Sequence, residues 1–237
     1  MKIEILYPEL CGMFGDGMNM TYLSQCIPEA EIIKTSLKSR PQFVDGNVDM
    51  IYMGFMTEHS QELVCNALRE YKARISELIE GGTMFLITGN AMEIFGQYIE
   101  KDDGTRIEML GIFDTYAKRR MYARYNAFYV GKFGDIDVVG FKSQFSHSYG
   151  GEGIAPLFDT VKGDGRSPGT PGEGIRVNNF MATYLMGPLL VLNPSFTEHI
   201  MEKLGARDRP SVFAETARAA YEKRLAQFME PTRNFLY

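Results

Sequence analysis

The stretch that decides the fold is Thr83-Met84-Phe85-Leu86-Ile87-Thr88-Gly89-Asn90-Ala91-Met92-Glu93-Ile94-Phe95-Gly96. Residues 83–87 form a short apolar run, which is typical of a parallel strand that is buried on both faces. The run passes through Thr88 and Gly89 into residues 90–98, which we expect to form a helix. A buried strand that leads through a tight turn into a helix is the unit from which open parallel sheets are built.

The segments on the N-terminal side repeat this alternation. Apolar runs predict three further strands, at residues 1–7, 30–37 and 48–54. A glycine-rich turn at 12–17 leads to a predicted helix at 18–26, with Asp16 in a position to cap it. Apolar residues three or four apart predict a long amphipathic helix within 63–79. This order predicts a three-layer, flavodoxin-like α/β fold with a mostly parallel central sheet, whose sites lie at the carboxyl ends of the strands.

The C-terminal half has a different character and predicts a β-rich region. We expect strands at 111–116, 126–131, 135–144, 175–177 and 181–186. Residues 161–174 are rich in glycine, proline and charge, which favours a mobile surface loop. Two helices, at 195–204 and 212–228, are expected to close the chain. No linker divides the sequence, so residues 1–237 are expected to form a single domain.

Composition excludes several classes of function. The 237 residues carry a net charge of −5, so the basic face of a nucleic-acid-binding protein is not indicated. Three cysteines and three histidines, without metal-ligand spacing, favour neither a disulfide framework nor a metal centre, and we expect no cofactor. No run reaches the 18 or more apolar residues of a membrane span, and the N-terminus lacks a signal-peptide core. The chain is therefore expected to be cytoplasmic.

Four segments carry a resemblance to a known family. They are Asp16-Gly17-Met18-Asn19, 49–54, 85–96 and 182–188. Together they resemble the class I glutamine amidotransferases, in the cobyric-acid-synthase-like (CobB/CobQ-like) branch. Within that branch the chain is most similar to the small glutaminase subunit of lipid II isoglutaminyl synthase. The resemblance covers residues 2–204 and implies the class I amidotransferase fold.

The resemblance also locates the family's reactive residues. Such glutaminases attack the side-chain amide of glutamine with a cysteine thiolate on a strand-to-helix turn, and a histidine transfers the proton. The family's turn reads Cys-Gly-Gly-x-Gln-x-Leu-Gly, whereas here Gly89 holds the nucleophile position and Glu93 the glutamine position. Met186 holds the base position, where relatives read Gly-Thr-Tyr-Leu-His-Gly-Pro. The usual glutaminase activity is therefore expected to be absent.

Six residues are candidates for binding a ligand at the former site: Gly54, Phe55, Gly89, Asn90, Glu93 and Arg124. Backbone N–H groups at the turn could bind a small anion or amide, and relatives supply a second oxyanion N–H at Gly54-Phe55. Arg124 lies in the one basic cluster, in the region where relatives place a glutamine-binding arginine. The structural alternatives are a turn kept for the fold, a strand-end glycine and a solvated basic loop.

Several functions remain open at this point. The first is a non-catalytic subunit that associates with a synthetase, which the resemblance implies is Mur-ligase-like in a cell-wall pathway, with a cobalamin-pathway synthetase as an alternative. The second is an enzyme with a rebuilt site that uses Thr88, Cys11 or Glu93. The third is a free-standing module that binds a small carboxylate or amide.

Overall fold

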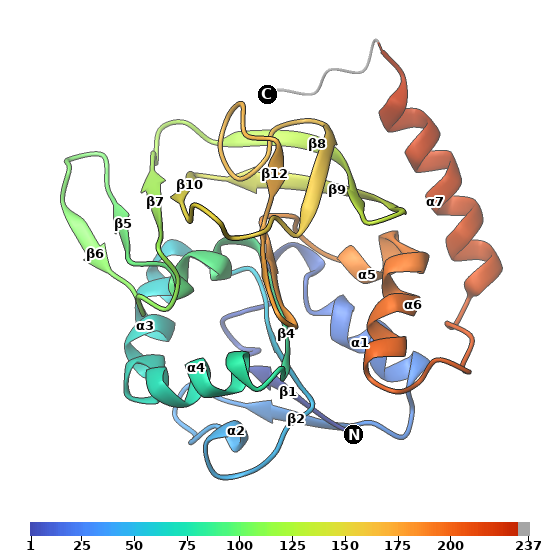
Figure 1. Ribbon diagram of the computed structural model, residues 1–237, viewed down its shortest axis with the longest axis horizontal. Helices are drawn as coiled ribbons and strands as arrows, with labels where there is room; N and C mark the ends of the chain where they lie inside the picture. Colours follow the sequence, from blue (N-terminus) through green and yellow to red (C-terminus); the bar gives the residue numbers. More distant parts are fainter. Residues whose placement is uncertain (232–237) are drawn as a thin grey trace.

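The computed structural model describes residues 1–231 and has three layers, with a six-stranded sheet between two groups of helices (Figure 1). The strands are β1 (Lys2–Leu6), β2 (Glu31–Thr35), β3 (Met50–Met53), β4 (Met84–Thr88), β13 (Ile175–Val177) and β14 (Phe180–Thr183). Their order is β13-β14-β4-β3-β1-β2, and every pair is parallel except β13 with β14. Five of the six strands thus follow a flavodoxin-like order, as predicted.

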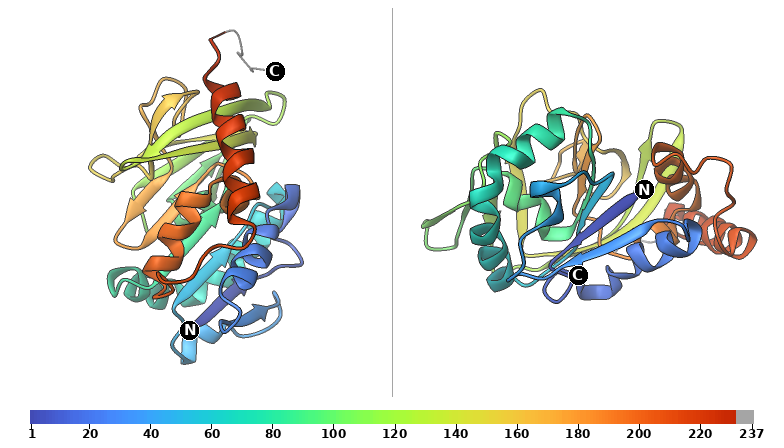
Figure 2. Two further views of the ribbon diagram at one scale, coloured as in Figure 1. Left: turned by 90° about the vertical axis from the view of Figure 1, so that its right-hand side faces the viewer. Right: turned by 90° about the horizontal axis from the view of Figure 1, so that it is seen from below.

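Helices cover both faces of this sheet (Figures 1 and 2). α3 (Glu58–Leu68) and α4 (Lys72–Glu80) lie on one face, and α1 (Met18–Cys26) and α6 (Pro194–Lys203) lie on the other. Successive side chains of a strand point to opposite faces. On β3, Ile51 therefore packs with the first pair of helices and Met50 with the second. Burial on both faces explains why these strands read as continuous apolar runs.

The second half of the chain adds two smaller sheets. One has the order β10-β7-β5-β6 and the other β12-β11-β8-β9. Their strands are β5 (Tyr98–Glu100), β6 (Arg106–Glu108), β7 (Thr115–Arg119), β8 (Tyr125–Phe133), β9 (Ile136–Gln144), β10 (Ser146–Gly150), β11 (Phe158–Lys162) and β12 (Gly172–Glu173). α7 (Ala214–Met229) packs on β8 and β9 through Phe228, whose ring stacks on that of Phe128 at 4.3 Å.

The helices of the first half differ from the prediction in two places. The long amphipathic helix is two helices, α3 and α4, separated by a 3₁₀ turn at Arg69–Tyr71. The helix expected at 90–98 is present but shorter and of a different type: a 3₁₀ helix, η3 (Gly89–Phe95), follows β4 and leads through Gly96 and Gln97 into β5. The helix stops before Gly96 because the chain there packs closely against Thr115 and turns into the sheet. A Cβ on Gly96 would lie 2.7 Å from the backbone oxygen of Thr115.

Three boundaries in the second half also differ. The strand expected at 111–116 begins at Thr115, because residues 110–113 instead bond to the backbone of η3. The predicted strand at 181–186 ends at Thr183. The segment 161–174 contains the end of β11 and all of β12, so it is partly a sheet edge. Two short helices, α2 (Gln42–Asp45) and α5 (Leu189–Leu192), were not predicted.

Some predictions are not tested by these elements. The single domain over 1–237 stays a prediction, and its last six residues lie outside the described part of the chain. No helix within residues 1–231 combines the length and apolar character needed to cross a membrane.

Candidate functional site

The strand-to-helix turn at Gly89 lies at the carboxyl end of β4, at the position where the family resemblance predicts the nucleophile. Gly89 follows the last residue of β4, is buried and has φ of +66°. A Cβ on this residue would lie 2.0 Å from Cδ2 and 2.7 Å from Cγ of Phe55. Real Cβ atoms do not approach other heavy atoms this closely. The ring of Phe55 therefore occupies the space in which any side chain at this turn would begin.

Phe55 is held in that place by its backbone and by its ring. Its N–H donates to Oδ2 of Asp16 at 2.7 Å, so the N–H at the place where the resemblance implies an oxyanion contact is bonded to a carboxylate. Its side chain is only 5% exposed and packs edge-on against Phe14, with ring centroids 5.0 Å apart. Phe14 is 42% exposed and forms the outer layer of this pair. Two aromatic rings thus cover the turn.

Asn90, the next candidate residue, uses both polar atoms of its side chain in hydrogen bonds within the protein. Its Nδ2 donates to the backbone oxygen of Met56 at 2.8 Å, and its Oδ1 accepts from the N–H of Met56 at 3.1 Å. This reciprocal pair fastens the loop after β3 to the turn after β4. Asn90 therefore supports the position of Phe55, one residue before Met56.

Asp16 lies beneath the loop after β3 and the turn after β4. Its carboxylate accepts hydrogen bonds from Phe55 N–H, from the Thr88 hydroxyl and from Asn19 Nδ2, and the Tyr52 hydroxyl donates to its backbone oxygen at 2.8 Å. Burial raises the pKa of Asp16, and these donors act in the opposite direction. The prediction that Asp16 caps the helix at 18–26 is wrong: Gly17 is the N-cap of α1, and no side chain caps it.

Two glycines leave room for the Asp16 carboxylate. A Cβ on Gly54 would lie 2.5 Å from Oδ2 of Asp16, and a Cβ on Gly187 would lie 2.5 Å from Oδ1. Gly54 ends the apolar run of β3, and Gly187 follows Met186. The loops after β1, β3, β4 and β14 therefore converge on Asp16 at the carboxyl ends of the strands, where the prediction placed the site.

Glu93 is the centre of a second buried network. Its Oε1 accepts from the hydroxyls of Ser146 and Tyr184, and its Oε2 accepts from Gln61 Nε2 at 2.9 Å. Gln61 in turn accepts a hydrogen bond from the Arg119 guanidinium. Burial raises the pKa of the Glu93 carboxyl, which is 5% exposed. The residue that replaces the family's glutamine ties α3, β7, β10 and the end of β14 together.

The other positions named from the sequence are half-buried, exposed or chemically blocked. Met186 is half-buried, and its N–H donates to the backbone oxygen of Phe141 at 3.0 Å. Arg124 is exposed, with its guanidinium carbon 4.4 Å from the centroid of the Phe145 ring. Cys11 is buried, and burial raises the pKa of its thiol far above the usual range. Such a thiol does not supply a thiolate near neutral pH.

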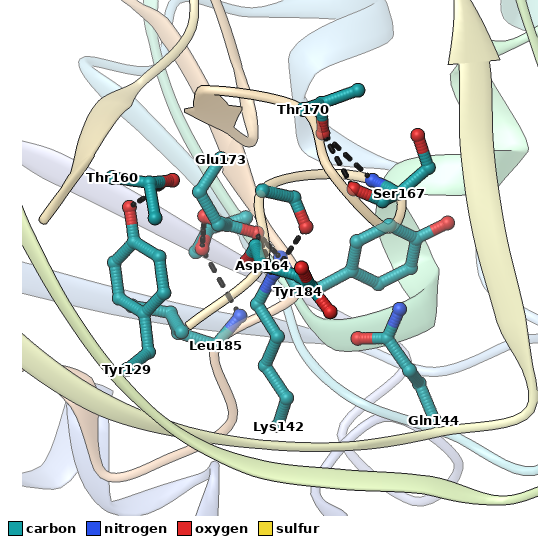
Figure 3. Close-up of polar contacts among 12 residues, drawn as sticks. Tyr129, Lys142, Gln144, Thr160, Asp164, Ser167, Thr170, Glu173, Tyr184 and Leu185 are labelled. Carbon is teal, nitrogen blue, oxygen red and sulfur yellow. Dashed lines mark hydrogen bonds and ion pairs between the residues drawn. The ribbon is translucent and has the colours of Figure 1, made fainter. Parts of the chain in front are cut away.

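An ion pair next to the end of β14 was not predicted. Nζ of Lys142 lies 3.5 Å from Oε1 of Glu173, and both side chains are almost fully buried (Figure 3). Lys142 also donates to the backbone oxygens of Asp164 and Gly165, at 2.9 and 2.7 Å. Glu173 accepts from the Tyr184 N–H at 2.9 Å. The pair thus attaches the 161–174 segment to the residues that lead to Met186.

The features that the sequence did not reveal are contacts between distant segments. Asp16 and Asn19 belong to one of the segments that resemble the family. Their spacing of three residues was the one sequence signal that their side chains form a hydrogen bond. The position of the Phe55 ring had no sequence signal. Lys142 stands in a strand of mixed polarity, where its burial could not be read from its neighbours. Among residues 1–231, no three His, Cys, Asp or Glu side chains are placed to hold a metal ion.

The fold and this turn define a class of protein. A parallel sheet in flavodoxin-like order, with a positive-φ residue at a turn after β4, is the framework of a class I glutamine amidotransferase. The chain belongs to the CobB/CobQ-like glutamine amidotransferase domain family, whose profile matches residues 2–193.

Individual relatives agree with this membership. The GatD subunit of lipid II isoglutaminyl synthase (glutamine-hydrolyzing) from Staphylococcus aureus strain N315 is 28% identical over 155 residues. That match covers 65% of this chain and 63% of the relative, less than two thirds of its length. A glutamine amidotransferase of known structure superposes with a TM-score of 0.57 at 13% identity, covering 85% of this chain and 98% of the other. PurLQS from Thermotoga maritima gives 0.56 at 11%, covering 94% and 98%. These two structures support the fold.

Proposed function

We propose that this chain is a non-catalytic glutamine amidotransferase-like subunit, which associates with a synthetase as a scaffold or regulator and does not release ammonia from glutamine. The observation that carries the proposal is the ring of Phe55 in the place of a side chain at position 89. A missing cysteine alone would leave an open pocket. A filled pocket means that neither a nucleophile nor a substrate amide has room at the turn.

The proton-transfer group is missing as well. Met186 has a thioether, which cannot act as a general base. Loss of a nucleophile together with its base removes several orders of magnitude in rate. The Phe55 N–H, which would have to face an oxyanion, is bonded to Asp16. The nucleophile position and the base position thus lack reactive groups, and the Phe55 N–H is already bonded, which supports a lost glutaminase function.

The pathway is proposed from the relative that the chain resembles. Its name assigns it to lipid II isoglutaminyl synthase, so a cell-wall synthetase of the Mur-ligase type is the partner we propose. A cobalamin-pathway synthetase is the alternative partner, since the family name covers both branches. We place the complex in the cytoplasm, where such synthetases find ATP.

One observation favours a second function, an enzyme with a rebuilt site. The Thr88 hydroxyl donates to the Asp16 carboxylate, which is the arrangement of a nucleophile with its base. Thr88 is fully buried, however, below the loop that carries Phe55. If the protein shows any enzymatic activity, Thr88→Val tests this second function. Unchanged activity in the variant would rule out Thr88 as the nucleophile of a rebuilt site. A free-standing carboxylate or amide binder would need space at the turn, which Phe55 fills.

The test of the proposed function uses the complex from native cells. The tagged chain is purified from its own organism, the bound proteins are identified by mass spectrometry, and nitrogen transfer is assayed with glutamine or ammonium. We expect an ATP-dependent synthetase that amidates its substrate with ammonium and not with glutamine. A chain that elutes alone, or a complex that transfers nitrogen from glutamine, would contradict the proposal.

A further inference from the structure

A cleft of about 540 Å³ opens beside α1, separate from the filled turn at Gly89. The β1–α1 loop forms its end wall. Its floor is made by Ile5, Ile32 and Tyr52, from β1, β2 and β3. Small-molecule sites typically measure about 300–1,000 Å³. The cleft therefore has the size of a binding site for one small molecule.

The cleft exists because β2 is the edge strand of the central sheet. α1 packs over β1 and β3, which leaves Ile32 half-buried at the edge. Met20 and Ser24 of α1 form the facing wall. The floor is thus apolar, and one side remains open to solvent.

Lys34 gives the cleft a charge. It lies two residues after Ile32 on β2, so its side chain points to the same face of the sheet. It lines the cleft and is exposed, and no carboxylate within residues 1–231 forms an ion pair with it. Three other strand lysines have a carboxylate partner, as Lys132 has Asp137 at 2.8 Å, whereas Lys34 has none within residues 1–231. An unpaired ammonium above an apolar floor, in a chain of net charge −5, is complementary to an anion.

We propose that this cleft binds a small organic anion with an apolar body, such as an aryl carboxylate or sulfonate. The apolar body lies on the half-buried Ile32, above the buried Tyr52, and the anionic group lies beside Lys34. Tyr52 connects the cleft to the former active site, because its hydroxyl donates to the backbone oxygen of Asp16 at 2.8 Å. The site does not use Gly89, so it is independent of the proposed loss of glutaminase activity.

The test compares two fluorescent probes that share an apolar body. 1-Anilinonaphthalene-8-sulfonate carries a sulfonate, and N-phenyl-1-naphthylamine is its uncharged counterpart. We expect saturable 1:1 binding of both probes to the folded protein. Lys34→Gln should weaken binding of the sulfonate about three- to fivefold, the scale of a partly exposed ion pair, and leave the uncharged probe unaffected.

Two variants control this test. Lys223→Gln removes an exposed lysine from α7, away from the cleft lining, and should change neither affinity. Ser24→Phe fills the cleft and should abolish binding of both probes, with folding verified by circular dichroism. The proposal is overturned if the wild-type protein shows no saturable binding, or if Lys34→Gln affects the sulfonate no more than Lys223→Gln does. Neither result bears on glutamine hydrolysis, because the assay contains neither glutamine nor a partner.

Discussion

At position 89 the backbone has φ of +66°, a conformation that is costly for any residue with a Cβ. Glycine removes that cost. It also removes the Cβ that would otherwise meet the ring of Phe55. We therefore propose that the glycine at position 89 and the ring of Phe55 are coupled, because a side chain at position 89 and this ring cannot occupy the same space.

Gly89→Ala tests this mutual requirement. Overpacking against Phe55, added to the positive φ, should reduce the free energy of unfolding by about 2–4 kcal/mol. In the Phe55→Ala background the same change should cost clearly less, since the ring is gone. Urea unfolding of the four proteins in this double-mutant cycle measures the coupling.

Gly104→Ala is the matched control. Gly104 has φ of +79°, but a Cβ there would meet no atom within 4 Å, so it reports the cost of the backbone conformation alone. If Gly89→Ala costs no more than Gly104→Ala, or costs the same with and without the Phe55 ring, the ring does not occupy the site.

Glu93 predicts how stability depends on pH. Burial raises its pKa above the ordinary value of 4.5, so the folded state binds the proton more tightly than the unfolded state. Its contribution to stability is therefore full below the ordinary value and is lost as the pH rises through the raised pKa. The stability of the wild-type protein relative to Glu93→Gln should fall as the pH rises from the ordinary value of 4.5 through the raised pKa.

Urea titrations of both proteins across that range provide the measurement, with the exposed Glu222→Gln as a variant that should follow the wild type. A wild-type advantage that grows with pH would show that the donors around Glu93 outweigh its burial.

At the scale of elements, the Lys142–Glu173 pair fixes a segment that has little regular structure of its own. Lys142 on β9 holds two carbonyl groups of the 161–174 segment, and Glu173 holds the backbone at Tyr184. The glycine- and proline-rich composition predicts mobility for this segment, but these contacts attach it to the rest of the protein.

Removing one partner of this pair should be far costlier than removing both. Lys142→Met leaves Glu173 buried without its counter-ion, and we expect a loss of about 3–5 kcal/mol in the free energy of unfolding. Lys142→Met with Glu173→Gln should recover part of that loss. Lys132→Met, which breaks an exposed pair, should have little effect by the same chemical denaturation measurement. Equal effects of the buried and exposed changes would contradict the assignment.

The elements that the sequence predicted are those with a periodic apolar pattern. The central strands and α1, α6 and α7 agree within a few residues, because burial on one or two faces leaves a readable pattern. The helix expected at 90–98 forms only to Phe95, as a 3₁₀ helix, because Asn90 and Glu93 bond to other segments and the chain enters β5 at Tyr98. The cap expected of Asp16 failed for a similar reason: its partners lie 39 and 72 residues away, at Phe55 and Thr88.

The same limit applied to the site. The resemblance identified Gly89 and Met186 as the altered positions, and the structure places Gly89 at the turn. It did not indicate that Phe55 fills the space, since a phenylalanine after a strand reads as ordinary core. Arg124 was selected from a basic cluster in the region where relatives place a glutamine-binding arginine, and its guanidinium lies over the ring of Phe145. Contacts of this kind depend on three-dimensional packing and have no local pattern.

At the scale of the whole molecule, the Glu93 network joins the parallel sheet to the β-rich half, and the Asp16 network joins loops of the parallel sheet to one another. Glu93 links η3 with β10 and the end of β14, and Asp16 links the loops after four parallel strands. In an active amidotransferase the same place holds substrate and catalytic groups. Here it is filled by the protein's own side chains, which would turn a reaction centre into a structural centre.

Glutamine hydrolysis by the isolated, purified chain tests the central claim most directly. Released ammonia is measured by a coupled dehydrogenase assay, with Thr88→Val and Glu93→Gln as parallel samples. The account predicts release at the rate of a buffer blank in all three, because no nucleophile, base or open pocket is present. Ammonia release at a turnover of about one per second or faster, within the ordinary range for enzymes, would contradict it.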